Sequence, residues 1–145
     1  MTGRERRRIA GHAIRPTLVV VAVASLAATI AAASMTGVSG WWVALGLLAP
    51  DLLPLVAFRR PERPGLMPRS MVPFYNATHS VIGPIALLGI AAVFLSPVVG
   101  VIAASWLTHI VWDRSVGYGL READGQNRGE SAARAAHAAA GIPQR

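Results

Sequence analysis

Hydrophobic residues are grouped along the chain in four long blocks, and the charged residues gather in the short segments between them. Each block holds about 17–23 residues, enough for an α-helix to cross a hydrocarbon core roughly 30 Å thick. The alternation of apolar and polar residues that is typical of half-buried strands does not describe these blocks. The pattern therefore predicts an all-α protein, a bundle of four transmembrane helices at residues 16–34, 41–58, 73–95 and 97–113.

Proline and glycine mark the ends of two of these helices. Pro16 opens the first block, and Pro97 follows Ser96 at the start of the fourth, where proline suits the first helical turn. Gly117 lies just after the fourth block, and we expect it to end that helix in a left-handed conformation.

The arginines predict how the chain is oriented in a membrane. Residues 35–40 and the turn at Ser96 carry no charge, whereas the amino-terminal arm, the middle loop and the tail are rich in arginine. Positive connectors face the cytoplasm, and four spans with both termini inside satisfy this rule at every connector. A cleaved signal peptide in the first block is the alternative, but the apolar core is long and three more spans follow. The predicted organisation is a basic cytoplasmic arm at 1–15, a membrane domain at 16–120 and a flexible cytoplasmic tail at 121–145.

Composition narrows the classes of function. The 145 residues carry a net charge of +7 and no cysteine, so disulfides, thiolate metal sites and cysteine nucleophiles are excluded. A basic chain also suggests nucleic acid, but these arginines lie between apolar blocks, where anionic lipid and membrane orientation require them. We therefore expect a multi-pass protein of the cell membrane, with the lipid bilayer as its partner and no nucleic acid.

Four ionisable residues interrupt the apolar blocks at one predicted depth. Counted from the cytoplasmic ends of their helices at 1.5 Å per residue, Asp51 lies ~10 Å, His79 ~9 Å and His109 ~6 Å inside. Asp113 is four residues after His109 and shares its helix face. A carboxylate at membrane depth costs ~2.5–3.5 kcal/mol on insertion scales, so it should face a partner or a wet cavity. Two carboxylates and two imidazoles from three helices are suited to one divalent ion, Zn²⁺, Mn²⁺ or Fe²⁺.

Simpler explanations exist for the same residues. In the simpler explanation, Asp113 lies at the membrane interface and pairs with Arg114 or water, and the histidines donate hydrogen bonds between helices. Asp51 resists such an explanation most, because it lies between Pro50 and Pro54, which free backbone carbonyls and bend the helix.

Three segments resemble known membrane families. "LLAPDLLPLVAF", "VPFYNATHSVIGPIALL" and "SWLTHIVWDRSVGYGL" are similar to three blocks of a small integral-membrane family called domain of unknown function 4260, over roughly residues 41–120. A looser similarity links the chain to membrane-bound metal-dependent hydrolases, through a P-D motif, an H-S pair and an H-x-x-x-D helix. That second family has further acids and a histidine near its first motif, which "PDLLP" lacks. The residues that match the first family's pattern include Asp51, Tyr75, Asn76, His79, His109, Asp113, Arg114 and Tyr118.

These observations are compatible with three functions. The favoured interpretation is a non-catalytic membrane protein whose polar cluster fixes helix packing or binds a partner, such as a second copy of the chain. The second interpretation is an enzyme, a metal-dependent hydrolase that acts on a lipid-like or phosphorylated substrate. A haem or electron-transfer bundle with the two histidines as axial ligands is the third. In the hydrolase, the metal ligands would be Asp51, His79, His109 and Asp113, with Tyr75 assisting catalysis and Asn76, Arg114 and Tyr118 binding substrate.

Overall fold

The computed structural model describes residues 14–58, 66–129, 131 and 139. Most of the predicted basic arm, part of the middle arginine loop and most of the tail beyond residue 129 lie outside these residues. The described part is all-α, with one isolated bridge between Arg121 and Asn127 in place of any strand. Its elements are α2 (Pro16–Thr36), α3 (Gly40–Phe58), the 3₁₀ helix η1 (Arg69–Met71), α4 (Val72–Thr78), α5 (Ile82–Val93) and α6 (Pro97–Ser115).

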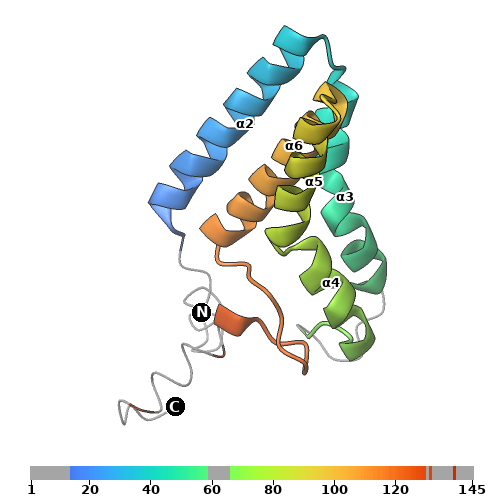
Figure 1. Cartoon of the computed structure of the whole chain (residues 1–145). Helices are drawn as coiled ribbons and strands as arrows, with labels where there is room; N and C mark the ends of the chain where they lie inside the picture. The colour runs from blue at the N-terminus through green and yellow to red at the C-terminus, as the bar shows by residue number, and fades with distance from the viewer. Residues whose placement is uncertain (1–13, 59–65, 130, 132–138, 140–145) are drawn as a thin grey trace.

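The chain runs up and down in alternate directions, as Figure 1 shows from the blue α2 to the orange α6. The beginning of α2 and the end of α6 meet at one end of the bundle, where the backbone N–H of Arg15 donates to the carbonyl of Ser115 at 2.8 Å. Helix α6 packs against α2, α3 and α5, and is therefore the central helix.

The predicted starts of α2 and α6 and the predicted conformation of Gly117 agree with the structure, and both helices run two residues further than predicted. Helix α2 begins at Pro16 and stops at Gly37, whose φ of 68° is left-handed. Helix α6 begins at Pro97, and the hydroxyl of Ser96 accepts from the backbone N–H of Val99 at 3.5 Å. Gly117 has the expected positive φ, 88°.

The third block differs from the prediction of one continuous helix, because it is broken into α4 and α5. His79, Ser80 and Val81 lie between the two helices. Pro84 explains the position of the break: proline has no N–H for the carbonyl four residues earlier, that of Ser80, and its ring crowds that carbonyl. The break places His79 at the end of α4, away from regular helix.

The bundle buries several polar groups beside its apolar core and exposes many large apolar side chains. Thr29, Ser105 and Thr108 are buried, and the hydroxyls of Ser25 and Thr108 hydrogen bond at 2.7 Å between α2 and α6. Val23, Leu48, Ile82 and many other large apolar residues are exposed. Two stretches, Pro16–Thr36 and Arg69–Val93, are long and apolar enough to cross a membrane by length and composition.

Residues 121–129, which the sequence analysis assigned to the flexible tail, fold back onto the helices. The side-chain amide of Asn76 donates to the carbonyl of Arg121 at 2.9 Å and accepts from its N–H at 2.7 Å. The carbonyl of Gly125 accepts from the N–H of Met67 at 3.4 Å. The segment that packs with the helices therefore continues past residue 120.

Candidate metal centre

Four side chains from three parts of the bundle meet at one point. Asp51 comes from α3, His79 from the end of α4, and His109 and Asp113 from successive turns of α6. The Nε2 atom of His79 lies 3.2 Å from Oδ1 of Asp51, 3.4 Å from Oδ2 of Asp113 and 3.3 Å from Nε2 of His109. The Nε2 atom of His109 lies 3.7 Å from each of the same carboxylate oxygens. The structure thus brings together the four residues that the sequence analysis selected as metal ligands.

The spacing of these atoms fits a tetrahedral ion. Ligand atoms about 2.0–2.1 Å from a central zinc ion are separated by about 3.3–3.4 Å along the edges of a tetrahedron. The separations around the two histidines range from 3.2 to 3.7 Å, and all four ligand atoms lie within 4.8 Å of one another. The contacts of the two histidines are therefore close to a tetrahedral edge, and the four atoms together could hold one metal ion.

Backbone and ring contacts set the orientation of His79. Its Nδ1 lies 3.0 Å from the carbonyl oxygen of Tyr75. With the proton on Nδ1, this nitrogen donates to the Tyr75 carbonyl and the lone pair of Nε2 points to the other three ligands, as metal binding requires; with the proton on Nε2, that nitrogen donates instead to Oδ1 of Asp51 at 3.2 Å. The ring of Tyr75 stacks on the imidazole, with centroids 3.9 Å apart and planes 14° apart.

Two side chains of α6 complete the hydrogen bonding where α4 ends. The indole N–H of Trp106 donates to the carbonyl of Thr78 at 2.7 Å. The guanidinium of Arg114 donates to the carbonyl of His79 at 3.2 Å. Both carbonyls lie next to the helix break, where regular helical partners are missing, so α6 stabilises the break that presents His79.

The centre is closed on one side and open on the other. The side chains of His79, His109 and Asp113 are 2%, 9% and 16% exposed, whereas that of Asp51 is 57% exposed. Water or a ligand therefore has access past Asp51. The closed side holds the two imidazoles within the packed helices.

The other predicted site residues occupy different places. Tyr75 supports His79 from behind its ring, and Arg114 contacts the His79 backbone. Both amide atoms of Asn76 hydrogen bond to the backbone of Arg121, so its contacts hold the chain after α6 against α4. Tyr118 borders a separate cavity at the end of α6.

Sequence reasoning missed Trp106 and Arg121. The guanidinium carbon of Arg121 lies 5.4 Å from the centre of the Tyr75 ring, which itself stacks on His79. Trp106 lies three residues before His109, a spacing that places both on neighbouring positions of one helix face. That spacing was a usable signal for Trp106, whereas Arg121 becomes recognisable only when the chain folds back.

Comparison with known proteins agrees with the sequence resemblance. No curated protein and no solved structure matches the chain. The family model described as domain of unknown function (DUF4260) matches residues 16–129, a range that contains every helix named above and all four residues of the metal centre. The chain therefore belongs to the DUF4260 family.

Proposed function

We propose that this protein is a membrane-embedded hydrolase that holds one divalent metal ion between Asp51, His79, His109 and Asp113. The proposal includes four membrane spans with both termini in the cytoplasm, and a lipid-like or phosphorylated substrate. The family carries no assigned activity, so the proposal depends on the centre itself.

One observation carries the metal: potential ligand atoms of two carboxylates and two imidazoles meet at short distance. With its proton on Nδ1, His79 directs an unprotonated Nε2 toward two carboxylate oxygens, at 3.2 and 3.4 Å, and toward the Nε2 of His109 at 3.3 Å. A cation between them would be ligated by all four side chains.

The exposed side of the centre is suited to hydrolysis. A bound divalent ion lowers the pKa of a coordinated water toward ~7 and so supplies a nucleophile at neutral pH. His79, His109 and Asp113 hold their positions within the packed helices, whereas Asp51 borders the open side. Asp51 is therefore placed to orient an incoming water and to accept its proton, while Tyr75 keeps the His79 ring in place.

The surroundings favour a lipid-like substrate. A cavity of about 150 Å³ lies between α3, α4 and α6, and almost all of its lining is apolar. Pro50 and Thr78 line this cavity, and the next residues in the chain are Asp51 and His79. The exposed apolar surface of the helices supports a position within lipid. An apolar chain in this cavity would thus end beside the metal centre.

The two histidines do not suit haem. Axial ligands to a haem iron bind on opposite faces of a flat macrocycle. Here two carboxylate oxygens lie 3.2 and 3.4 Å from the Nε2 of His79, in the space that the macrocycle would fill.

Metal analysis of the purified protein tests the proposal. The protein is stripped with a chelator, reloaded separately with Zn²⁺, Mn²⁺ or Fe²⁺, and analysed for bound metal. We expect about one ion per chain, and a large loss of metal in His109→Ala. His12→Ala and His137→Ala are the matched controls, because each removes a histidine that is not one of the four proposed ligands and should keep the metal. No bound metal in the unsubstituted protein contradicts the proposal.

An activity screen then tests hydrolysis. Metal-loaded protein in lipid nanodiscs is incubated with phosphate esters and with glycerolipids, and the released phosphate, alcohol or fatty acid is measured. We expect turnover that disappears in Asp51→Asn even when the metal remains bound. If the protein binds metal but hydrolyses none of these substrates, the hydrolase proposal is rejected and the metal-binding proposal is kept.

The second candidate function is a structural metal site, and the number of protein ligands is the observation that supports it. Four protein ligands at tetrahedral spacing are typical of closed structural sites, whereas catalytic sites usually keep one position for water. This function agrees with a non-catalytic bundle whose polar cluster fixes helix packing. It predicts that removing the metal lowers the thermal unfolding temperature strongly and that Asp51→Asn behaves like His109→Ala.

A further inference from the structure

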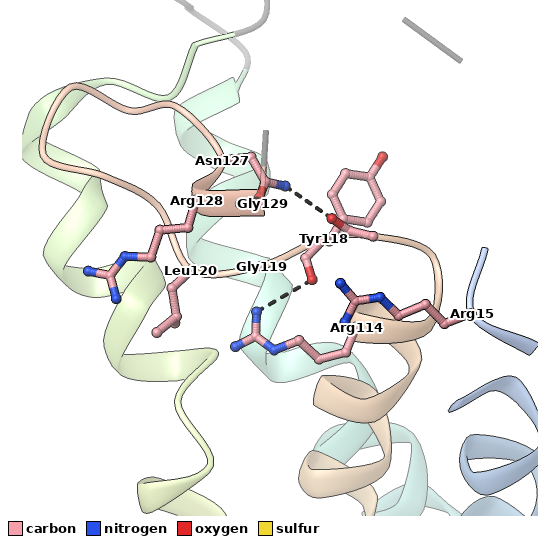
Figure 2. A pocket seen from close by; sticks show the side chains of 9 residues that line it. Arg15, Arg114, Tyr118, Gly119, Leu120, Asn127, Arg128 and Gly129 are labelled. Atoms are coloured by element: carbon pink, nitrogen blue, oxygen red, sulfur yellow. Dashed lines mark hydrogen bonds between the residues drawn. The ribbon is translucent and has the colours of Figure 1, made fainter. Parts of the chain in front are cut away.

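A second, positively charged cavity lies at the end of α6. It has a volume of about 250 Å³, and three arginines line it: Arg15 before α2, Arg114 in the last turn of α6, and Arg128 beyond the bridge. Gly117 and Gly119 form part of the wall between them. Figure 2 shows the side chains of Arg15, just before α2, and of Arg114, in the last turn of α6, reaching the same loop.

Within the described part of the chain, one carboxylate forms an ion pair with the arginines of this cavity. Among the described residues, Arg128 alone of the three arginines makes an ion pair, with the carboxylate of Glu122 at 3.1 Å. The guanidinium of Arg114 donates hydrogen bonds to two backbone carbonyls, those of Tyr118 at 3.4 Å and His79 at 3.2 Å. Bringing guanidinium groups to one cavity costs electrostatic energy, which an anion in the cavity would offset.

The cavity is connected to the metal centre through Arg114. This arginine lines the cavity and donates to the carbonyl of His79, whose imidazole is a proposed ligand. The residue before it in the chain, Asp113, is another ligand. The order along α6 is therefore the apolar cavity at Ile102 and Trp106, the metal centre at His109 and Asp113, and the arginine cavity from Arg114 onward.

We propose that the arginine cavity binds a phosphoryl group and that the substrate of the metal centre is a phosphorylated amphiphile. This inference rests on the proposed function and adds the substrate class. Guanidinium groups recognise phosphate oxygens with paired N–H donors, and three arginines around one cavity suit a group that carries up to two negative charges. An apolar chain in the smaller cavity and a phosphoryl group among the arginines would place the bonds between them at the metal centre.

Two probes separate the sources of the phosphoryl group. Dioctanoyl phosphatidic acid represents a lipid head group, and inorganic phosphate represents a free anion. Binding of each to the metal-loaded protein in detergent is measured by calorimetry. Tighter binding of the phosphatidic acid assigns the cavity to a lipid, and equal binding assigns it to a soluble phosphate; binding of neither probe overturns the inference.

The variant Arg15→Gln tests the cavity itself. Arg15 makes its fold-stabilising contact through its backbone N–H, so the side chain can be changed with the smallest effect on packing. We expect the affinity for the bound probe to fall roughly tenfold, the value of one charge-assisted hydrogen bond. Arg69→Gln is the matched control, because it removes an exposed arginine outside the cavity and should leave the affinity unchanged. Equal affinities of Arg15→Gln and the unsubstituted protein overturn the inference.

Metal content is measured in the same samples, so that the two proposals fail separately. If the protein holds no metal but Arg15→Gln still weakens binding of phosphatidic acid, the anion site is supported and the metal-dependent hydrolase is rejected. If the protein holds its full metal content but Arg15→Gln does not change the affinity for either probe, the metal centre is supported and the phosphorylated substrate is rejected.

Discussion

Three contacts act on different atoms of the His79 side chain and backbone. The carbonyl oxygen of Tyr75 lies 3.0 Å from Nδ1, the ring of Tyr75 covers one face of the imidazole, and Arg114 donates to the backbone carbonyl. The Nε2 atom is left for the other three ligands. A histidine restrained in this way loses little further freedom when an ion binds, which raises the affinity for metal.

The pH dependence of metal binding follows from the ligand types. Imidazoles bind metal only in their unprotonated form, and carboxylates only as anions, so protons compete with the ion for all four ligands. We expect metal occupancy to be complete above neutral pH and to be lost as the pH falls. Occupancy is measured by dialysis against a fixed concentration of free Zn²⁺ between pH 8 and pH 5. Occupancy that does not change over this range would contradict ligation by the two histidines.

At the scale of elements, the break between α4 and α5 is the feature on which the centre depends. A continuous helix would hide the Thr78 and His79 carbonyls in regular hydrogen bonds, whereas the break exposes them to Trp106 and Arg114 of α6. Helix α6 therefore contributes two ligands and also holds in place the residue that contributes a third.

Trp106→Phe tests the support that α6 gives to the break. The substitution keeps an aromatic ring against α5 but removes the N–H that donates to Thr78, leaving a carbonyl without its partner. We expect a loss of ~1–3 kcal/mol in the free energy of unfolding, together with weaker metal binding. Trp112→Phe is the control on the same helix, because Trp112 is 49% exposed. Thermal unfolding in detergent compares the two variants, and equal stabilities would contradict the role of Trp106.

The contact between α3 and α6 requires a residue without a side chain at position 46. A Cβ atom on Gly46 would lie 2.5 Å from the Ile102 carbonyl oxygen and 2.6 Å from the Ser105 Cβ. Gly46→Ala should therefore force the helices apart and cost ~1–3 kcal/mol, with loss of metal because Asp51 lies on α3. Gly89→Ala is the matched control, since a Cβ there meets no atom within 4 Å and alanine favours the helix. A Gly46→Ala protein as stable as Gly89→Ala would show that the helices can separate freely.

At the scale of the whole molecule, several polar side chains are buried in the bundle while many large apolar side chains are exposed on its surface. Buried hydroxyls and imidazoles gather around α6, whereas Val93, Phe94 and Leu95 at the end of α5 are at least 75% exposed. Water would penalise this arrangement and lipid would not. The arginine cavity and the backbone contact between Arg15 and Ser115 lie at one end of the bundle, which the topology proposal places in the cytoplasm.

Cysteine labelling in intact cells tests that topology. The chain has no cysteine, so a single introduced cysteine gives an unambiguous signal. We expect Ser39→Cys, in the turn between α2 and α3, to react with a membrane-impermeant thiol reagent added outside. Ser70→Cys, in η1, should react only after the membrane is permeabilised. The reverse pattern would place the arginine-lined end outside the cell and contradict the topology.

The sequence by itself determined the positions of α2, α3 and α6 and the four residues that are candidate metal ligands. Long apolar blocks and terminal prolines are local signals, so the bounds of α2, α3 and α6 could be predicted closely. The ligands were recognisable because ionisable residues are costly inside apolar segments, and helical rise placed them at one depth.

Only the tertiary structure decided how those residues meet and what supports them. The break at His79, the hydrogen bonds from Trp106 and Arg114, and the return of Arg121 to Tyr75 join residues 28 to 46 positions apart. No local pattern encodes such contacts, because each depends on the packing of α6 against helices formed elsewhere in the chain. The arginine cavity has the same origin: Arg15 and Arg114 are separated by almost the whole bundle in sequence and become neighbours when α2 and α6 pack together.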